Sequence, residues 1–164
     1  MQPKSDYFAA VKEAVKYLKE NLEEIPEVAV SLGTGLGSLT DNMRITSRIN
    51  YSEIPNFPTS TVKSHAGELL YGNLEGEDLL CFSGRTHYYE GYSLKDTTFY
   101  VRVLGELGVK HLILTNAAGS INADMTTGTF MQLKDHIYQL PDNPLRGENY
   151  DNWGPRFPDM SEVY

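Results

Sequence analysis

Residues 83–92 bring a guanidinium, an imidazole, a carboxylate and several phenols into one short segment. Arg85 and His87 alternate along an extended chain, so both side chains can point to one side and reach the same anion. Arginine supplies a permanent charge, and histidine supplies one that depends on pH. Glu90 can hold the His87 ring and favour its protonated form, which would strengthen binding of a phosphate dianion. Any one of these residues alone would indicate only surface or packing; together they predict an anion site.

Two further turns are expected beside this segment. A Gly-Thr-Gly-Leu-Gly sequence at residues 33–37 follows the apolar stretch 28–32, and Asn-Ala-Ala-Gly at residues 116–119 follows another apolar stretch. Open α/β sheets bind ligands at the carboxyl ends of their strands. Backbone N–H groups at a glycine turn bind anions, and the Thr34 hydroxyl adds a donor. The three segments therefore predict a phosphate pocket built from three strand ends.

The glycine turn at residues 33–37 has two other interpretations. It resembles a dinucleotide fingerprint, with Glu53 near the position expected for a ribose-binding acid. However, Ser38 occupies the third glycine position, and a proline-containing loop follows Glu53 where a helix should begin. The turn could also need glycine only for its backbone freedom. A phosphate-binding turn fits the neighbouring residues better than either alternative.

The spacing of apolar residues predicts alternating helices and strands in one domain over residues 1–164. Strands alternating with helices indicate an α/β fold with a mostly parallel or mixed central sheet flanked by helices. We expect helices at 5–23, 36–43 and 93–108, an edge strand at 44–51, a hairpin of strands at 68–74 and 78–82, buried strands at 28–32 and 111–115, a further strand at 130–137, and irregular chain at 139–164.

Composition excludes several classes of partner and site. The chain has 14 basic and 22 acidic side chains and a net charge of −8, so it has no general basic field for nucleic acid or an anionic membrane. We find no signal peptide and no apolar run that could span a bilayer, which predicts a cytoplasmic protein. The single cysteine, Cys81, lies in an apolar strand and is expected in the core, consistent with a reducing compartment.

No metal site or covalent nucleophile is expected. The histidines show no metal-ligand spacing with a carboxylate or cysteine, and the chain has no Gly-x-Ser-x-Gly elbow. Catalysis at the predicted pocket would therefore depend on positioning and on charge stabilisation.

A set of ordered motifs makes the chain closely similar to the trimeric purine nucleoside phosphorylases. The resemblance covers essentially the whole chain. The related methylthioadenosine phosphorylases are less similar because they lack the His-Tyr-Glu-Gly-Tyr type of segment. The motifs that carry the resemblance lie at residues 33–37, 65–67, 84–92, 115–119, 143–147, 156–158 and 160–161.

The resemblance implies a role for each matching residue on the phosphate side. Thr34 matches a hydroxyl residue that binds phosphate, and Arg85 and His87 match the phosphate-binding arginine and histidine. Ala117 matches an alanine whose backbone N–H contacts phosphate, and His65 matches a histidine near the phosphate.

Further roles implied by the resemblance concern catalysis and the sugar. His87 and Glu90 match the catalytic pair, in which the carboxylate supports the histidine. Tyr89 matches the ribose-binding tyrosine. Phe157 matches an aromatic residue that closes the sugar site of a neighbouring subunit, which implies a homotrimer.

The reaction implied by the resemblance is reversible phosphorolysis of purine nucleosides of the inosine and guanosine type, giving the free base and ribose 1-phosphate in purine salvage. Inorganic phosphate is a co-substrate, and no cofactor is expected. Family members continue beyond the match with the residues that recognise the purine, so the expected fold is C-terminally incomplete. The alternatives are a non-catalytic phosphate- or nucleoside-binding remnant that needs a second chain, and a dinucleotide-dependent enzyme.

Overall fold

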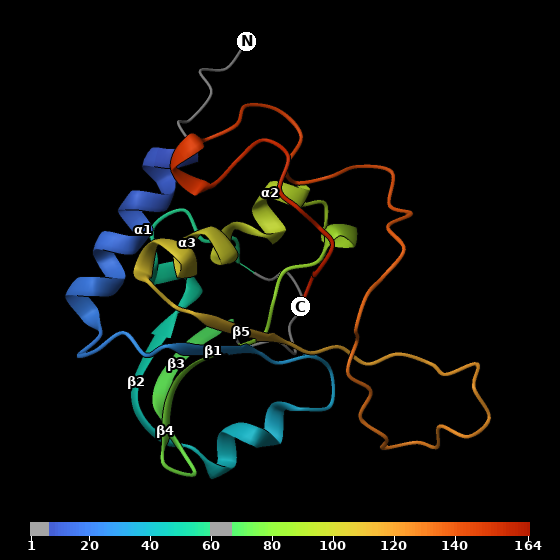
Figure 1. The fold of residues 1–164 in the computed structure, drawn as a ribbon. Helices are drawn as coiled ribbons and strands as arrows, with labels where there is room; N and C mark the ends of the chain where they lie inside the picture. Colours follow the sequence, from blue (N-terminus) through green and yellow to red (C-terminus); the bar gives the residue numbers. More distant parts are fainter. Residues whose placement is uncertain (1–6, 60–66) are drawn as a thin grey trace. The chain divides into compact units, whose positions relative to one another are not determined.

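The computed structural model describes residues 7–59 and 67–164. Contacts divide the chain into two compact units, of which the first ends at Ala117 and the second spans Ala118–Tyr164 (Figure 1). The first unit contains the sheet and the α-helices, and the second is almost entirely irregular. Each unit is described by itself.

The sheet of the first unit has five strands in the order β2-β3-β4-β1-β5. β1 pairs in parallel with both β4 and β5, whereas β3 pairs antiparallel with β2 and β4. This arrangement confirms the predicted α/β fold with a mixed sheet. Glu75 and Gly76 form the predicted hairpin turn, with φ angles of 53° and 98°. The strands are β1 Val28–Ser31, β2 Arg44–Asn50, β3 Glu68–Leu74, β4 Glu77–Ser83 and β5 His111–Leu114.

Apolar side chains cover one face of the sheet. Val30 of β1 lies beside Cys81 of β4 in the strand register, and both are buried. Because side chains alternate along a strand, residues two positions apart share this face. Leu36 and Leu39, which follow the glycine turn, pack against the cluster. The buried members are Val30, Leu32, Met43, Leu70, Leu79 and Cys81.

Helices α1 (Tyr7–Asn21) and α3 (Phe99–Leu107) pack against each other (Figure 1). Tyr7 and Phe99 make an edge-to-face contact with ring centroids 5.7 Å apart. The buried residues of α1, at helical spacing, are Val11, Ala14, Val15 and Leu18. Within residues 7–59 and 67–164, every helix is too short or too polar to cross a membrane.

The helix predicted for residues 93–108 is two helices. Ser93 caps α2 (Leu94–Thr97) by accepting a hydrogen bond from the Asp96 backbone N–H, and Gly108 ends α3 with a φ of 93°. The interruption is at Thr98, whose hydroxyl donates to the Leu94 carbonyl at 2.8 Å. The Thr98 backbone N–H donates to the same carbonyl at 3.2 Å, and the chain leaves helical geometry at Thr98, whose φ and ψ are −106° and 6°.

Two further elements differ from the prediction. The helix expected at residues 36–43 is a short 3₁₀ helix, Gly37–Asn42, in which the Thr40 hydroxyl donates to the Gly37 carbonyl. The strand expected to be buried at residues 111–115 is β5, which lies at the sheet edge. Ile113 and Leu114 of β5 are 53% and 58% exposed. Their apolar sequence indicated burial, but a strand with one neighbour has less of its surface covered.

The prediction of a strand at residues 130–137 is wrong. These residues have no strand conformation, and Phe130 and Ile137 are 85% and 86% exposed. A strand needs a neighbour to satisfy its backbone N–H and C=O groups, and apolar alternation does not supply one. The irregular conformation predicted for residues 139–164 is confirmed, apart from the short 3₁₀ helix Asp151–Trp153.

The buried position of Cys81 predicts an unreactive thiol. Cys81 is fully buried, as expected from the sequence, and burial raises the pKa of its thiol to about 11. Because the thiolate is the reactive form, we expect no labelling of the folded chain by a thiol reagent at pH 8. The same chain unfolded in urea should be labelled completely under the same conditions. Rapid labelling without denaturant would show that β4 opens or is not in the core.

Candidate active site

Three strand ends meet at one edge of the sheet. β4, β1 and β5 are adjacent and parallel, and their ends are level because Ser31 pairs with both Phe82 and Leu114. The chain therefore leaves all three strands at the same edge. The segment beginning at Gly84 follows β4, the glycine turn follows β1, and Thr115 follows β5. This is the edge at which open α/β sheets bind ligands.

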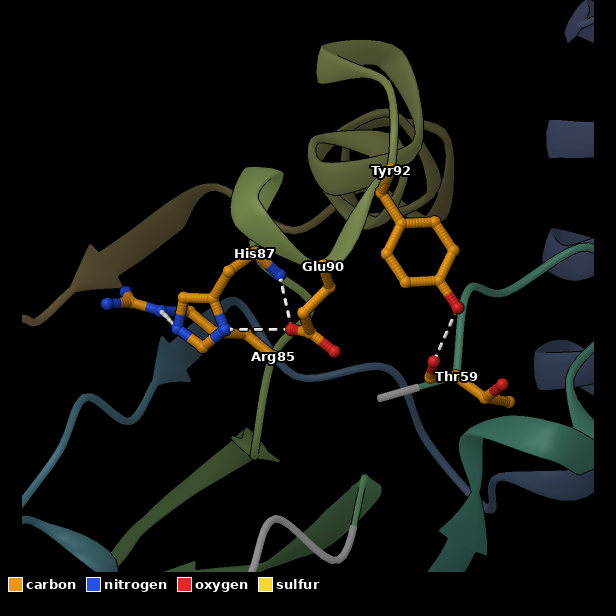
Figure 2. A network of polar contacts seen from close by, with 5 residues as sticks. All are labelled: Thr59, Arg85, His87, Glu90 and Tyr92. Atoms are coloured by element: carbon orange, nitrogen blue, oxygen red, sulfur yellow. Dashed lines mark hydrogen bonds and ion pairs between the residues drawn. The ribbon is translucent and has the colours of Figure 1, made fainter. Parts of the chain in front are cut away.

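Arg85, His87 and Glu90 form one network after β4 (Figure 2). The Arg85 Nε donates to the His87 Nε2 at 3.4 Å, and the Glu90 Oε1 lies 3.0 Å from the His87 Nδ1. Glu90 Oε1 also accepts from the His87 backbone N–H at 2.7 Å. The Glu90 side chain is only 2% exposed. A carboxylate bound at Nδ1 fixes the ring orientation and leaves Nε2 facing the guanidinium.

Two left-handed glycines shape this segment. Gly84 and Gly91 both have a φ of 96°, a conformation that residues with a side chain rarely adopt. The Tyr51 hydroxyl donates to the Gly84 carbonyl at 2.7 Å. Burial raises the pKa of Tyr51 far above its usual value, so this phenol stays neutral and remains a donor. Tyr51 therefore supports the turn that leads to Arg85.

Thr115 connects the other two strand ends to Arg85. The Thr115 hydroxyl accepts a hydrogen bond from the Gly33 N–H at 2.7 Å and donates to the Ser31 carbonyl at 2.8 Å. The Thr115 carbonyl accepts from the Arg85 Nη1 at 3.0 Å. The glycine turn and the arginine are thus bound to the same residue. Arg85 donates one guanidinium N–H to the Thr115 carbonyl and one to His87. Three of its five guanidinium N–H groups are not used by these two bonds, so Arg85 can still bind an anion.

Aromatic rings lie beside the network. Tyr89 stacks on His87 with ring centroids 4.8 Å apart and 17° between the planes, and it is 75% exposed. Such a ring can pack against a ligand that contacts the imidazole. Tyr92 lies further along the same segment, and its hydroxyl donates to the Thr59 carbonyl (Figure 2).

The remaining predicted residues have different positions. Thr34 is exposed on the glycine turn, directly after Gly33, and Ala117 is exposed two residues after Thr115. His65 lies outside the described residues. Phe157 belongs to the second unit and is 88% exposed. Among residues 7–59 and 67–164, we find no group of three or more His, Cys, Asp or Glu side chains that could hold a metal ion.

Two residues of this region were not predicted. Tyr51 contacts Gly84 across 33 positions of sequence, and no local pattern indicates that contact. Thr115 gave a weak signal, because it is a polar residue that ends an apolar strand next to a predicted ligand-binding turn. Its three partners, however, are visible only in the folded chain.

Comparison with known proteins identifies the family of the chain. Residues 27–164 match the phosphorylase superfamily. Purine nucleoside phosphorylase 1 from Geobacillus stearothermophilus is 50% identical over 155 residues, and purine nucleoside phosphorylase from Mus musculus is 48% identical over 153 residues. These alignments cover 94% and 91% of this chain but 57% and 53% of the relatives. The chain therefore spans about half the length of the curated relatives it matches.

Solved structures give the same result. A Schistosoma mansoni purine nucleoside phosphorylase in complex with BCX-34 superimposes with a TM-score of 0.85 at 38% identity. The match covers 94% of this chain and 57% of the Schistosoma chain. Isoform 2 of purine nucleoside phosphorylase from that organism, in complex with cytosine and ribose-1-phosphate, superimposes with a TM-score of 0.84 at 39% identity. This match covers 94% of this chain and 55% of the isoform 2 chain. With a match to the family over most of its length and this agreement in fold, the chain belongs to the phosphorylase superfamily.

Proposed function

We propose that this chain carries the phosphate side of a purine nucleoside phosphorylase active site. The reaction is the reversible phosphorolysis of inosine- and guanosine-type nucleosides to the free purine base and ribose 1-phosphate, as in purine salvage. The observation that carries the proposal is the Arg85–His87–Glu90 network beside Thr115, at the edge where three strands end. Its support is the high identity with relatives named purine nucleoside phosphorylase.

In this proposal the phosphate binds between the three strand ends. Arg85 supplies the permanent positive charge, and His87, whose ring is held by Glu90, supplies a second contact beside it. The Thr34 hydroxyl and the Ala117 backbone N–H complete the described donors, and we propose His65 as a further contact. The net charge of −8 makes these local donors necessary, because the chain as a whole repels an anion.

The chemistry follows from this arrangement. A phosphate oxygen forms a bond to the anomeric carbon as the glycosidic C–N bond breaks, and the electron pair of that bond passes to the purine, which takes up a proton. Positive charge develops on the sugar in the transition state, so a dianion held close to the anomeric carbon stabilises it. Holding the phosphate in line for attack also removes the entropic cost of bringing two reactants together. Neither effect requires a cofactor other than the phosphate co-substrate.

The sugar contacts and the assembly are part of the same proposal. We assign ribose binding to Tyr89, whose ring is exposed and stacked on His87. Phe157 would close the sugar site of a neighbouring subunit, as the resemblance implies, and this role requires a homotrimer. We propose a cytoplasmic location because the single cysteine is buried and unpaired.

The test is release of hypoxanthine from inosine by the purified chain, with and without phosphate. Binding of phosphate alone is measured in parallel by calorimetry. We expect release only when phosphate is present, because phosphate is the attacking group. A His87→Ala variant, which lacks the imidazole between Arg85 and Glu90, should release less base under the same conditions.

The outcomes separate the two candidate functions. Phosphate-dependent release supports a phosphorylase site. Phosphate binding without release supports the alternative, a non-catalytic phosphate- or nucleoside-binding chain that needs a second polypeptide for activity. Absence of both binding and release would overturn both.

A further inference from the structure

We propose that Thr115 is a positioning residue that sets the distance between the parts of the phosphate site. The inference rests on the proposed function and adds a residue to it. Thr115 is not itself a phosphate ligand in this proposal. It acts through Arg85, through the glycine turn at residues 33–37 and through the segment that leads to Ala117.

The contacts of Thr115 reach each of the three strand ends. Its backbone N–H and its hydroxyl both donate to the Ser31 carbonyl at the end of β1, at 3.2 Å and 2.8 Å. Its hydroxyl accepts from the Gly33 N–H, and its carbonyl accepts from Arg85. Thr115 itself follows β5. It therefore joins the groups that follow β1 and β4 to the end of β5.

The Thr115 hydroxyl is used in both directions, as donor to Ser31 and as acceptor from Gly33. A hydroxyl can do both because it has one hydrogen and two lone pairs. A methyl group of the same size can do neither, and Gly33 is buried, so its N–H would lose its acceptor. The geometry needs a hydroxyl at this position and not only a side chain of this shape.

The consequence concerns the proposed phosphate donors. Thr34 directly follows Gly33, Ala117 follows Thr115 by two positions, and Arg85 binds the Thr115 carbonyl. A change at Thr115 therefore displaces donors from three segments at once. Charge-assisted hydrogen bonds to an anion depend strongly on distance and angle, so this displacement weakens phosphate binding without removing any ligand group.

The test compares Thr115→Val with Thr115→Ser. Valine keeps the branched shape but removes the hydroxyl, and we expect about a fivefold to tenfold loss of phosphate affinity by calorimetry, as for one or two hydrogen bonds. Serine keeps the hydroxyl and should restore affinity to within about twofold. Thr46→Val is the matched control, because the Thr46 hydroxyl also donates to a carbonyl of another strand, that of Tyr71, away from the site. It should leave phosphate affinity unchanged.

Urea unfolding of each variant separates stability from positioning. If Thr115→Val and Thr46→Val lose similar stability but only the first loses phosphate affinity, Thr115 positions the site. If the unchanged chain binds phosphate and Thr115→Val binds it equally well, the positioning role is overturned while the proposed function stands. If the unchanged chain binds no phosphate, the proposed function fails and this role fails with it. Should Thr115→Val not fold, Thr115→Ala carries the same expectation, since it places no methyl group against the Gly33 amide.

Discussion

Phosphate should bind the Arg85→Ala variant at least about tenfold more weakly than the unchanged chain, because a hydrogen bond to a charged group contributes roughly 1.5–3 kcal/mol. Arg85 is the one group of the network whose charge does not depend on pH. Its removal also takes away the donor to His87 Nε2 and the donor to the Thr115 carbonyl. The affinity is measured by titration calorimetry with inorganic phosphate, and far-ultraviolet circular dichroism checks that the variant folds.

Arg48→Ala is the matched control for Arg85→Ala. It removes the same charge from a chain whose net charge is −8, so a general electrostatic effect would be equal in the two variants. Arg48 lies in β2, is 58% exposed and pairs with Glu68 at 3.3 Å, an ion pair of a kind that contributes little to stability. We expect its phosphate affinity to stay within about twofold of the unchanged chain. Equal losses in both variants, or no loss in Arg85→Ala, would contradict the assignment of Arg85.

The fold of the first unit was largely predictable because its signals are local. The apolar spacing of α1, the hairpin turn at Glu75 and Gly76, and the cap residues Ser93 and Gly108 each depend on neighbouring positions. The contact between Arg85, His87 and Glu90 was predictable for the same reason, because the three residues lie within one short segment. Whether these residues bind phosphate remains a prediction.

Features that depend on distant partners were not predictable. The edge position of β5 depends on the order of strands in the sheet, in which β5 lies beyond β1. The apolar residues at 130–137 resemble a strand, but no strand forms there in the described chain. Thr115 and Tyr51 bond residues far away in sequence, so their support of the site appears only in three dimensions.

Gly33→Ala should abolish most phosphate binding, with a loss of about tenfold or more, as expected when several charge-assisted bonds are misaligned. A Cβ at position 33 would lie 2.6 Å from the Thr115 carbonyl oxygen and 2.8 Å from the Asn116 Cα. Both contacts are with backbone, so no side chain can rotate away, and the glycine turn must separate from the segment after β5. That separation breaks the Gly33–Thr115 hydrogen bond and moves the Arg85 acceptor. Calorimetry with inorganic phosphate measures the loss.

Gly72→Ala distinguishes this effect from a simple loss of stability. A Cβ at position 72 would lie 2.5 Å from the Arg44 carbonyl oxygen, which is a backbone clash of the same kind between β2 and β3. Overpacking of this type costs roughly 1–3 kcal/mol, so both variants should unfold at lower urea concentrations. Gly72 pairs with Leu79, near the start of β4, whereas Arg85 follows the end of that strand, so phosphate affinity should be retained in Gly72→Ala. Both variants are compared under conditions in which they fold. If Gly33→Ala and Gly72→Ala then lose phosphate affinity equally, the loss of affinity follows from lower stability alone, and the close approach of Gly33 to Thr115 has no specific role in binding.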